Sequence, residues 1–203
     1  MIEVKKNYHH GHLKDQLLEA VRQLVEEKGP DSFSIAEACR RAGVSTAAPY
    51  KHFKDRDEIL HGVILGAMHR MGEAMEAAAS AHPAQSQERI VALGKAYIDF
   101  ARAEPGMFAL MFGLTGGHGE DPALTEEGQA KFEIVCRVVA DHLSLPPDDP
   151  EVTARAYALW CAVHGHAFLV LDGKADKTKI SVDEDGYLRL VANAYLPPVA
   201  GGS

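Results

Sequence analysis

Cysteines and long apolar runs are scarce in this 203-residue sequence. The three cysteines, Cys39, Cys136 and Cys161, form no Cys-x-x-Cys pair, which argues against a disulfide framework or a zinc ribbon and favours a reducing compartment. The longest apolar stretch, residues 156–171, is interrupted by two histidines and is shorter than the ~20 residues that span a bilayer. The first residues, MIEVKKNYHHGH, lack the apolar segment of a signal peptide. We therefore expect a cytoplasmic protein without a membrane span.

Strand patterns are almost absent as well, whereas helical periodicity recurs along the chain. Alternating β-branched runs do not occur, and no Asn-Gly or Asp-Gly turn stands between apolar runs. Apolar residues repeat instead at spacings of three and four, between capping residues and Gly or Pro breakers. These patterns predict an all-α protein of about nine helices, at residues 13–28, 35–42, 46–53, 56–81, 86–103, 107–112, from 122 onward, 151–171 and 182–196.

Residues with N-capping side chains precede several of these helices. Ser34 and Ser181 each begin a Ser-x-x-Glu capping box, in which the serine accepts from an exposed amide and the glutamate reaches back. Asp121 and Asp149 each precede a proline, which suits the first position of a helix. Further caps are predicted at Ser45 and Asp55.

The charges are distributed unevenly. The whole chain has a formal net charge of −8, but residues 1–56 have a net charge of +2 and the remainder has −10. An acidic total argues against a nucleic-acid partner, whereas a basic first segment points towards one. An excess of two charges is also what an ordinary solvated face shows, so charge alone leaves both interpretations open.

The segment 34–53, SIAEACRRAGVSTAAPYKHF, has the layout of a helix-turn-helix. Two short helices are separated by Gly43, and the second could enter a DNA major groove with its N-terminal residues leading. Small side chains allow close approach to base edges, while Tyr50, Lys51 and His52 can donate to phosphates. An αα-corner without any nucleic-acid role has the same spacing. The predicted DNA contacts are Ser34, Ser45, Thr46, Ala47, Ala48, Tyr50, Lys51, His52 and Arg56.

Three groups of residues closely resemble the N-terminal domain of the tetracycline-repressor (TetR) family of transcriptional regulators: Ala42-Gly43-Val44-Ser45, Tyr50-Lys51-His52-Phe53 and Arg56-Asp57-Glu58-Ile59-Leu60. The resemblance covers roughly residues 8–65. It implies a DNA-binding domain at residues 1–55 and an effector-binding and dimerisation domain at residues 56–203. It further implies a homodimer that binds a palindromic operator and responds to a small-molecule effector, most often as a repressor.

Pro49 departs from the family pattern, which more often has Leu or Ile there. At the fourth position of the expected helix 46–53, proline removes only the first intrahelical hydrogen bond, so we expect the helix to survive with slight distortion. The start Tyr8-His9-His10-Gly11 resembles an arm found in a subset of the family, which implies a contact with phosphates or the minor groove.

Helix 151–171 is apolar on nearly every side, so both of its faces are expected to be buried, one of them against a partner subunit. Its Trp160, His164 and Gly165 resemble a C-terminal domain type named for Trp-His-Gly, in one branch of the same family. Together with helix 182–196 it forms the predicted dimer interface, as four helices from two subunits.

The resemblance also implies an effector cavity among the C-terminal helices. The candidate lining residues are Met68, Met71, Met75, Tyr97, Phe100, Met111, Phe112, Trp160 and His164. Each methionine and aromatic residue is also an ordinary core residue by type, and His164 fits a hydrogen-bonded core histidine.

No enzymatic, cofactor or metal site is predicted. His9, His10 and His12 have no further ligands at zinc spacing, and a phosphate contact by the arm explains them more simply. No nucleophile–base arrangement is apparent. Two other classes of function remain open: a helical small-molecule binding module with a vestigial helix-turn-helix, and a helical-bundle enzyme that uses the same cavity.

Overall fold

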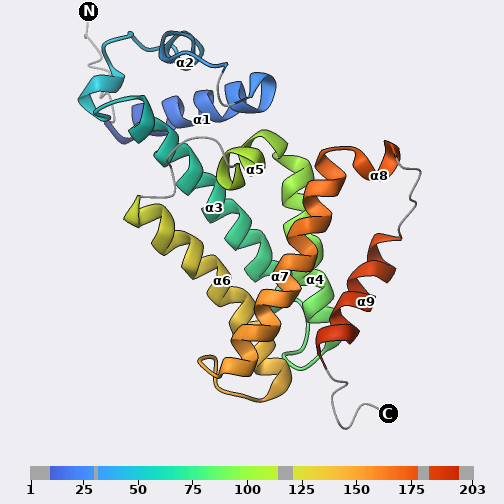
Figure 1. Ribbon diagram of the computed structural model, residues 1–203. Helices are drawn as coiled ribbons and strands as arrows, with labels where there is room; N and C mark the ends of the chain where they lie inside the picture. The colour runs from blue at the N-terminus through green and yellow to red at the C-terminus, as the bar shows by residue number, and fades with distance from the viewer. Residues whose placement is uncertain (1–9, 30–31, 114–120, 178–182, 197–203) are drawn as a thin grey trace, which may run out of the picture. The chain divides into compact units, whose positions relative to one another are not determined.

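The structure is a computed structural model that describes residues 10–29, 32–113, 121–177 and 183–196, without the side chains of residues 10–12, 175 and 176. All regular elements in these ranges are helices, which confirms the all-α class (Figure 1). No helix in the described part of the chain combines the length and apolar character that a bilayer crossing needs. The chain forms two compact units, Met1–Ala67 with Gly106–His118 and Met68–Pro105 with Gly119–Ser203. The functional division at residue 55 stays a prediction.

Unit 1 contains α1 (His10–Lys28), α2 (Ile35–Ala42), the 3-10 helix η1 (Pro49–Lys51), the first part of α3 (Arg56–Ser80) and α5 (Pro105–Phe112). Helix α2 lies against α1 (Figure 1). The apolar stripe of α1 is fully buried at Leu17, Val21, Leu24 and Val25, as its periodicity predicts. Burying such side chains stabilises the unit by roughly 1.5–3 kcal/mol each.

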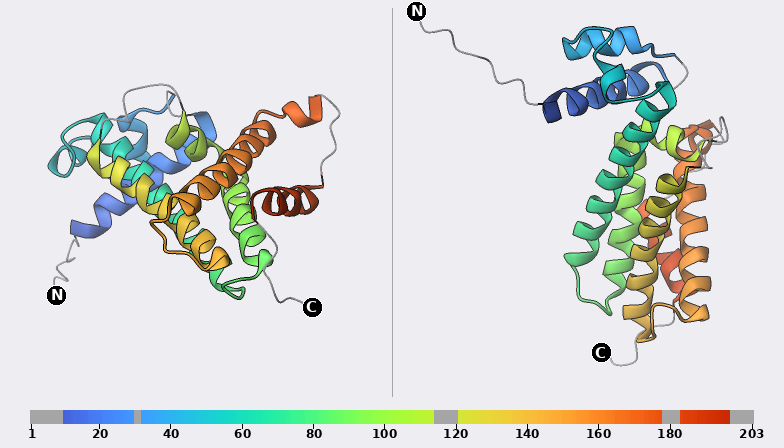
Figure 2. Two further views of the ribbon diagram at one scale, coloured as in Figure 1. Left: turned by 60° about the horizontal axis from the view of Figure 1, so that its bottom comes forward. Right: turned by 90° about the vertical axis from the view of Figure 1, so that its left-hand side faces the viewer.

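Unit 2 contains the rest of α3 with α4 (Gln87–Ala103), α6 (Pro122–Leu143), α7 (Pro150–Leu171), α8 (Lys174–Lys177) and α9 (Glu184–Tyr195). Helices α4, α6 and α7 run side by side, and α9 lies against α4 and α7 (Figure 2). The short α8 follows Gly173, which adopts a left-handed φ of 60°, and the periodicity did not indicate it.

The capping residues confirm most of the expected helix starts. Asp55 accepts from the Glu58 amide at 2.9 Å, and Asp149 accepts from the Glu151 amide at 2.8 Å. Asp121 accepts from two amides at the start of α6. The expected start of the last helix is wrong: Asp183 caps α9 through the Gly186 amide at 3.1 Å, because an aspartate two residues after the serine can make the same bond. Ser181 lies outside the described residues.

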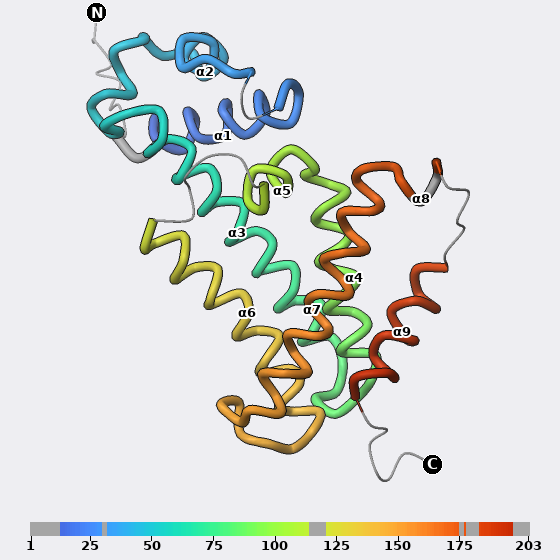
Figure 3. The backbone as a smooth tube through the Cα atoms, in the orientation of Figure 1, coloured from blue at the N-terminus to red at the C-terminus, as the bar shows by residue number. Residues whose placement is uncertain are grey.

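The expected α-helix at residues 46–53 is also wrong. Residues 46–48 form a turn that leads into η1, as the backbone trace shows (Figure 3). Because Pro49 has no N–H, it cannot donate to the carbonyl of Ser45, which instead accepts from the Ala48 amide at 3.0 Å. The next bond has the same three-residue span, from the Lys51 amide to the Ala48 carbonyl at 3.3 Å.

Candidate nucleic-acid interface and ligand cavity

The turn after α2 has the geometry that a helix-turn-helix needs. Gly43 adopts φ 69° and ψ 27°, and its amide donates to the Arg40 carbonyl at 3.2 Å. The Val44 amide donates to the Cys39 carbonyl at 2.9 Å, which completes a Schellman motif. Glycine adopts this left-handed conformation without a steric penalty, so the chain can leave α2 abruptly and redirect towards η1.

A reading surface, which we define as Ser45, Thr46, Ala47, Tyr50 and Lys51, follows this turn. All five residues are exposed, and Tyr50 has 61% of its surface accessible. Between them Pro49 is almost completely buried, so it retains the anchoring role of an apolar residue even though it changes the backbone. The buried Phe53 forms a second anchor at the end of the segment. Small side chains and hydrogen-bond donors therefore point outward, while the buried Pro49 and Phe53 anchor the segment.

Three further predicted DNA contacts are less exposed. Ala48 and His52 are half-buried. The guanidinium of Arg56 lies 4.5 Å from the centre of the Phe33 ring, a cation–π contact that holds its side chain at the start of α3.

Ser34 is occupied as a helix cap. Its hydroxyl oxygen accepts from the Glu37 amide at 3.2 Å, while its proton is still able to be donated outward. The reciprocal half of the expected capping box does not form, because the Glu37 carboxylate accepts from Lys28 at 2.6 Å instead. That ammonium group holds the pKa of Glu37 below its usual range.

Ion pairs within unit 1 offset part of its basic charge. Arg41 binds both carboxylate oxygens of Glu27, at 2.6 and 2.7 Å, and this pairing lowers the pKa of Glu27. Lys51 has no ion pair among the described residues and lies on the reading surface. Of the five residues that define the reading surface, Lys51 is the one with a formal charge. The predicted arm contacts of Tyr8 and His9, and the side chains of His10 and His12, lie outside the described residues.

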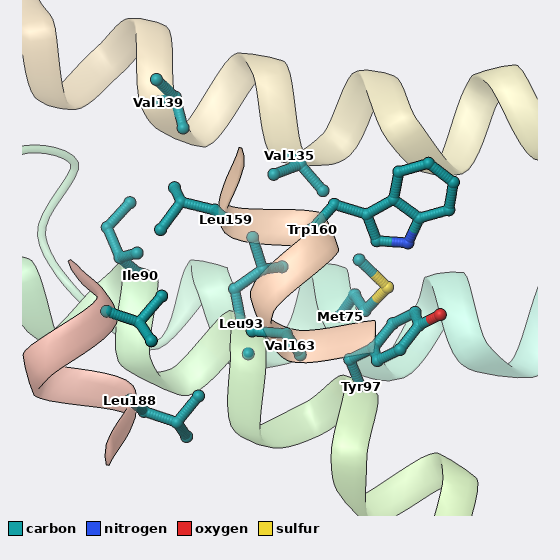
Figure 4. Close-up of a pocket in the computed structure, with 12 residues that line it drawn as sticks. Met75, Ile90, Leu93, Tyr97, Val135, Val139, Leu159, Trp160, Val163 and Leu188 are labelled. Atoms are coloured by element: carbon teal, nitrogen blue, oxygen red, sulfur yellow. The ribbon is translucent and has the colours of Figure 1, made fainter. Parts of the chain in front are cut away.

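A cavity of about 50 Å³ lies within unit 2 (Figure 4). Side chains from α3, α4, α6, α7 and α9 point into it from all around. Its lining residues are Met75, Ile90, Leu93, Gly94, Tyr97, Val135, Val139, Leu159, Trp160, Val163, Leu188 and Val191. The cavity is therefore built where five helices meet around a largely aliphatic interior.

Tyr97, Trp160 and His164 form a polar cluster beside the cavity. The Tyr97 hydroxyl and His164 Nδ1 are 2.7 Å apart. Burial raises the pKa of Tyr97, and a hydrogen bond from Trp160 partly opposes that rise. Burial lowers the pKa of His164, which favours its neutral form. An indole N–H only donates, so the phenol oxygen accepts from Trp160, whereas the donor in the Tyr97–His164 bond depends on the tautomer of the histidine.

The structure brings together three of the candidate effector residues, Met75, Tyr97 and Trp160, in the cavity lining. His164 lies just behind them, through its bond to Tyr97. Other candidates have different places: Met68, Met71 and Phe100 are buried along α3 and α4, while Met111 and Phe112 belong to α5 in unit 1.

Sequence reasoning missed most of the aliphatic lining. Leu159 and Val163 lie on an apolar stripe of α7, and Leu188 and Val191 lie on one of α9. That periodicity indicates burial for each of them, but it does not distinguish a side chain that faces a cavity from one that is fully packed.

Helices α7 and α9 each carry large apolar side chains that are exposed in the single chain. On α7 the side chains of Tyr157 and Leu169 are 57% and 50% exposed, although the opposite stripe is buried. On α9 the side chains of Leu190 and Tyr195 are 67% and 38% exposed. We call these four residues the outer apolar surface. Within one chain, then, α7 is buried on one face only.

Among the described residues, no group of three side chains that could bind a metal ion lies close together.

Comparison with known proteins extends over both units. Residues 17–63 match the family of bacterial regulatory proteins called the tetR family, and residues 90–194 match the tetracyclin repressor-like C-terminal domain. An uncharacterised HTH-type transcriptional regulator of Mycobacterium tuberculosis is 24% identical over 190 residues, which cover 93% of this chain and 86% of that protein.

Solved structures show the same fold. A protein of unknown function from Rhodococcus sp. RHA1 superposes with a TM-score of 0.78 at 29% identity, covering 94% of this chain and 97% of that one. A tetR-family transcriptional regulator from Streptomyces coelicolor superposes with a TM-score of 0.71 at 16% identity, covering 91% and 79%.

The family matches and the helix-turn-helix geometry agree with each other. Regulators of this family bind DNA and act as dimers, and they are transcription factors rather than enzymes. The Trp-His-Gly subtype of the C-terminal domain stays a prediction. With a reading surface in the first matched segment and a helical bundle in the second, this chain belongs to the TetR family of bacterial transcriptional regulators.

Proposed function

We propose that this protein is a ligand-responsive repressor that binds a palindromic operator as a homodimer. The observation that carries the proposal is the reading surface, which presents small and donor side chains on a turn anchored by Pro49 and Phe53. A regulator of bacterial chromosomal DNA works in the cytoplasm, and we propose the same location here.

On this reading surface, Thr46 and Ala47 meet base edges, and Tyr50 and Lys51 meet phosphates. Short side chains allow the backbone to come close to the bases, and a methyl group such as that of Ala47 can contact the methyl group of thymine. Phosphate contacts fix the position of the protein on the duplex without reading its sequence. Ser34, Ala48, His52 and Arg56 are proposed as additional contacts around this surface.

The outer apolar surface supports a dimer formed by α7 and α9. Large exposed apolar side chains on two neighbouring helices are typical of a protein–protein interface. A two-fold axis would bring the same two helices from each subunit together as four. Two reading surfaces related by that axis would require an operator with matching two-fold symmetry.

The cavity supports a response to a ligand. A ligand that binds one conformation of the dimer more tightly shifts the population towards that conformation. If the favoured conformation has its reading surfaces wrongly spaced, DNA is released. This mechanism makes the protein a repressor that the ligand inactivates.

Selection of binding sites from random DNA duplexes, followed by binding at a series of salt concentrations, tests the DNA-binding part. We expect a palindromic consensus and an affinity that falls steeply as salt rises, because phosphate contacts release counterions. If no sequence is enriched, the proposal is wrong and the cavity favours the alternative, a small-molecule binding module whose helix-turn-helix no longer acts.

A further inference from the structure

No charged side chain is found among the described residues that line the cavity of unit 2. Of the described residues that line it, Tyr97 has the one hydroxyl group and Trp160 the one indole N–H, and the others offer only hydrocarbon or a thioether. A charged group that entered would lose its hydration and meet no opposite charge, which is strongly unfavourable. The wall therefore selects against ions of either sign.

The one polar end of the cavity is neutral too. The Tyr97 hydroxyl lies 2.7 Å from His164 Nδ1, and the histidine is buried enough to favour its uncharged form. Figure 4 shows the Tyr97 hydroxyl and the Trp160 nitrogen on the same side of the lining. A phenol oxygen can take part in more than two hydrogen bonds, so one oxygen of a ligand could join this cluster.

We propose that the cavity binds an uncharged ligand that is mainly hydrocarbon and has one oxygen placed beside Tyr97. This inference rests on the proposed function, because it specifies the class of effector to which the regulator responds.

The ligand must widen the cavity when it enters. A cavity of about 150 Å³ holds benzene, so about 50 Å³ has room for only a few atoms. Leu188 of α9 is a lining side chain whose movement would widen the cavity. A Cβ at Gly94, on the facing helix α4, would come within 3.0 Å of Leu188 Cδ2. The leucine therefore fills the space directly above the glycine backbone, and a shift of its side chain opens that space.

Trp160 provides a direct readout, since it is the one tryptophan of the sequence and lines the cavity. The experiment titrates the full chain at pH 7 with 1-pentanol, pentanoate and pentylammonium, which share a five-carbon chain. We expect 1-pentanol to change the Trp160 emission in a saturable way, and each ion to bind at least about 100-fold more weakly. Lengthening the alcohol by one CH₂ should tighten binding up to about fourfold.

Two variants and a matched control locate the ligand. Tyr97→Phe should weaken 1-pentanol by about two- to tenfold and leave pentane within twofold, because only the alcohol loses a hydrogen bond. Leu188→Ala should tighten both ligands by enlarging the cavity. Leu145→Ala removes the same atoms from a half-buried position after α6, outside the cavity lining, and should change neither. Far-ultraviolet circular dichroism checks that each variant keeps its helices.

Two results overturn the inference. Binding of pentanoate or pentylammonium as tight as that of 1-pentanol would show that the wall does not select against charge. Absence of any Trp160 response to the alcohols, in both the parent chain and Leu188→Ala, would show that the cavity takes no ligand of this class. These titrations contain no DNA. If the protein selects an operator but does not bind the alcohols, only the proposal about the ligand is wrong. If the protein binds the alcohols but selects no operator, the DNA-binding proposal is wrong instead.

Discussion

Lys51 and Thr46 lie on one short turn, yet we assign them to different parts of the duplex. Lys51→Ala should weaken binding to all sequences to a similar extent and reduce the slope of log affinity against log salt by about one. Thr46→Ala should instead change which bases are preferred at one operator position, and leave that slope unchanged. Binding to the selected operator and to scrambled duplexes across a salt series measures both effects. If the two variants behave alike, our orientation of the turn is wrong.

Glu26 has a structural role within unit 1 that a single exposed charge would not have. Its two carboxylate oxygens accept from the amides of Gly106 and Met107, at 2.9 and 2.8 Å, in the first turn of α5. Glu26→Ala leaves both donors without this partner and should lower the free energy of unfolding by about 1–3 kcal/mol. Urea denaturation measures the change. Glu73→Ala, which removes an exposed carboxylate of α3, is the control and should stay within about 0.5 kcal/mol.

Among the elements, η1 depends on one residue. Pro49→Leu restores an amide that can donate to the Ser45 carbonyl, so the turn should gain α-helical character. We expect the base preference of the reading surface to change, because an α-helix and a 3-10 helix direct successive side chains differently. Site selection from random duplexes with the parent and the variant tests this. Ala77→Leu, at an exposed position of α3, should keep the parent consensus. An unchanged consensus in Pro49→Leu would contradict the prediction.

Helix α9 is held against α4 partly by an ion pair whose strength depends on pH. Arg102 Nη1 donates to Glu184 Oε1 at 2.9 Å, and this pair holds the pKa of Glu184 below its ordinary value of 4.5, with a further contribution from His166. A lowered carboxylate pKa stabilises the fold at pH values above about 4.5, and that contribution is lost as the pH falls through the folded-state value.

Arg102→Gln should therefore destabilise the protein by less than about 1 kcal/mol at pH 7, since the pair is partly exposed. The difference between variant and parent should shrink as the pH falls below the lowered value. Chemical denaturation at several pH values measures it. A difference that grows in acid would have the wrong sign for this ion pair.

Local signals predicted the helices well where one residue decides the outcome. Asp149 caps α7 as expected, because its carboxylate needs only a free amide two or three residues ahead. The effect of Pro49 on the backbone was predicted wrongly, because a segment this short can form either α-helical or 3-10 hydrogen bonds. Asp183 caps α9, whereas the sequence pattern predicted that cap at Ser181. In both cases the sequence pattern allows two hydrogen-bonding arrangements and does not distinguish between them.

For the whole molecule, the outer apolar surface should determine the oligomeric state. Leu190→Glu adds a charge at a position that is 67% exposed in one chain, so the subunit should still fold. Sedimentation equilibrium should show the variant as a monomer, with operator affinity at least about 100-fold lower because a monomer contacts one half-site. Ala77→Glu adds the same charge at an exposed position of α3 and should remain a dimer. A dimeric Leu190→Glu would place the interface elsewhere.

The cavity shows what the sequence could not supply at this scale. Trp160 and Tyr97 were identified as candidates because they are aromatic residues of the C-terminal helices, among which the family resemblance implies an effector cavity. Leu188 could not be identified, because its α9 stripe looks like any other buried stripe. Whether aliphatic residues from five helices fill the space between them depends on how the helices pack, which periodicity does not report.

The 3-10 turn at Pro49 also limits how far an operator code can be transferred between relatives. Successive residues rotate by about 120° in a 3-10 helix and about 100° in an α-helix, so side chains three positions apart differ in direction by roughly 60° between the two. Grafting base-contacting residues from a relative with an α-helical reading segment, offset by offset, would aim them at other bases. Engineering this regulator towards a new promoter must therefore begin with its backbone.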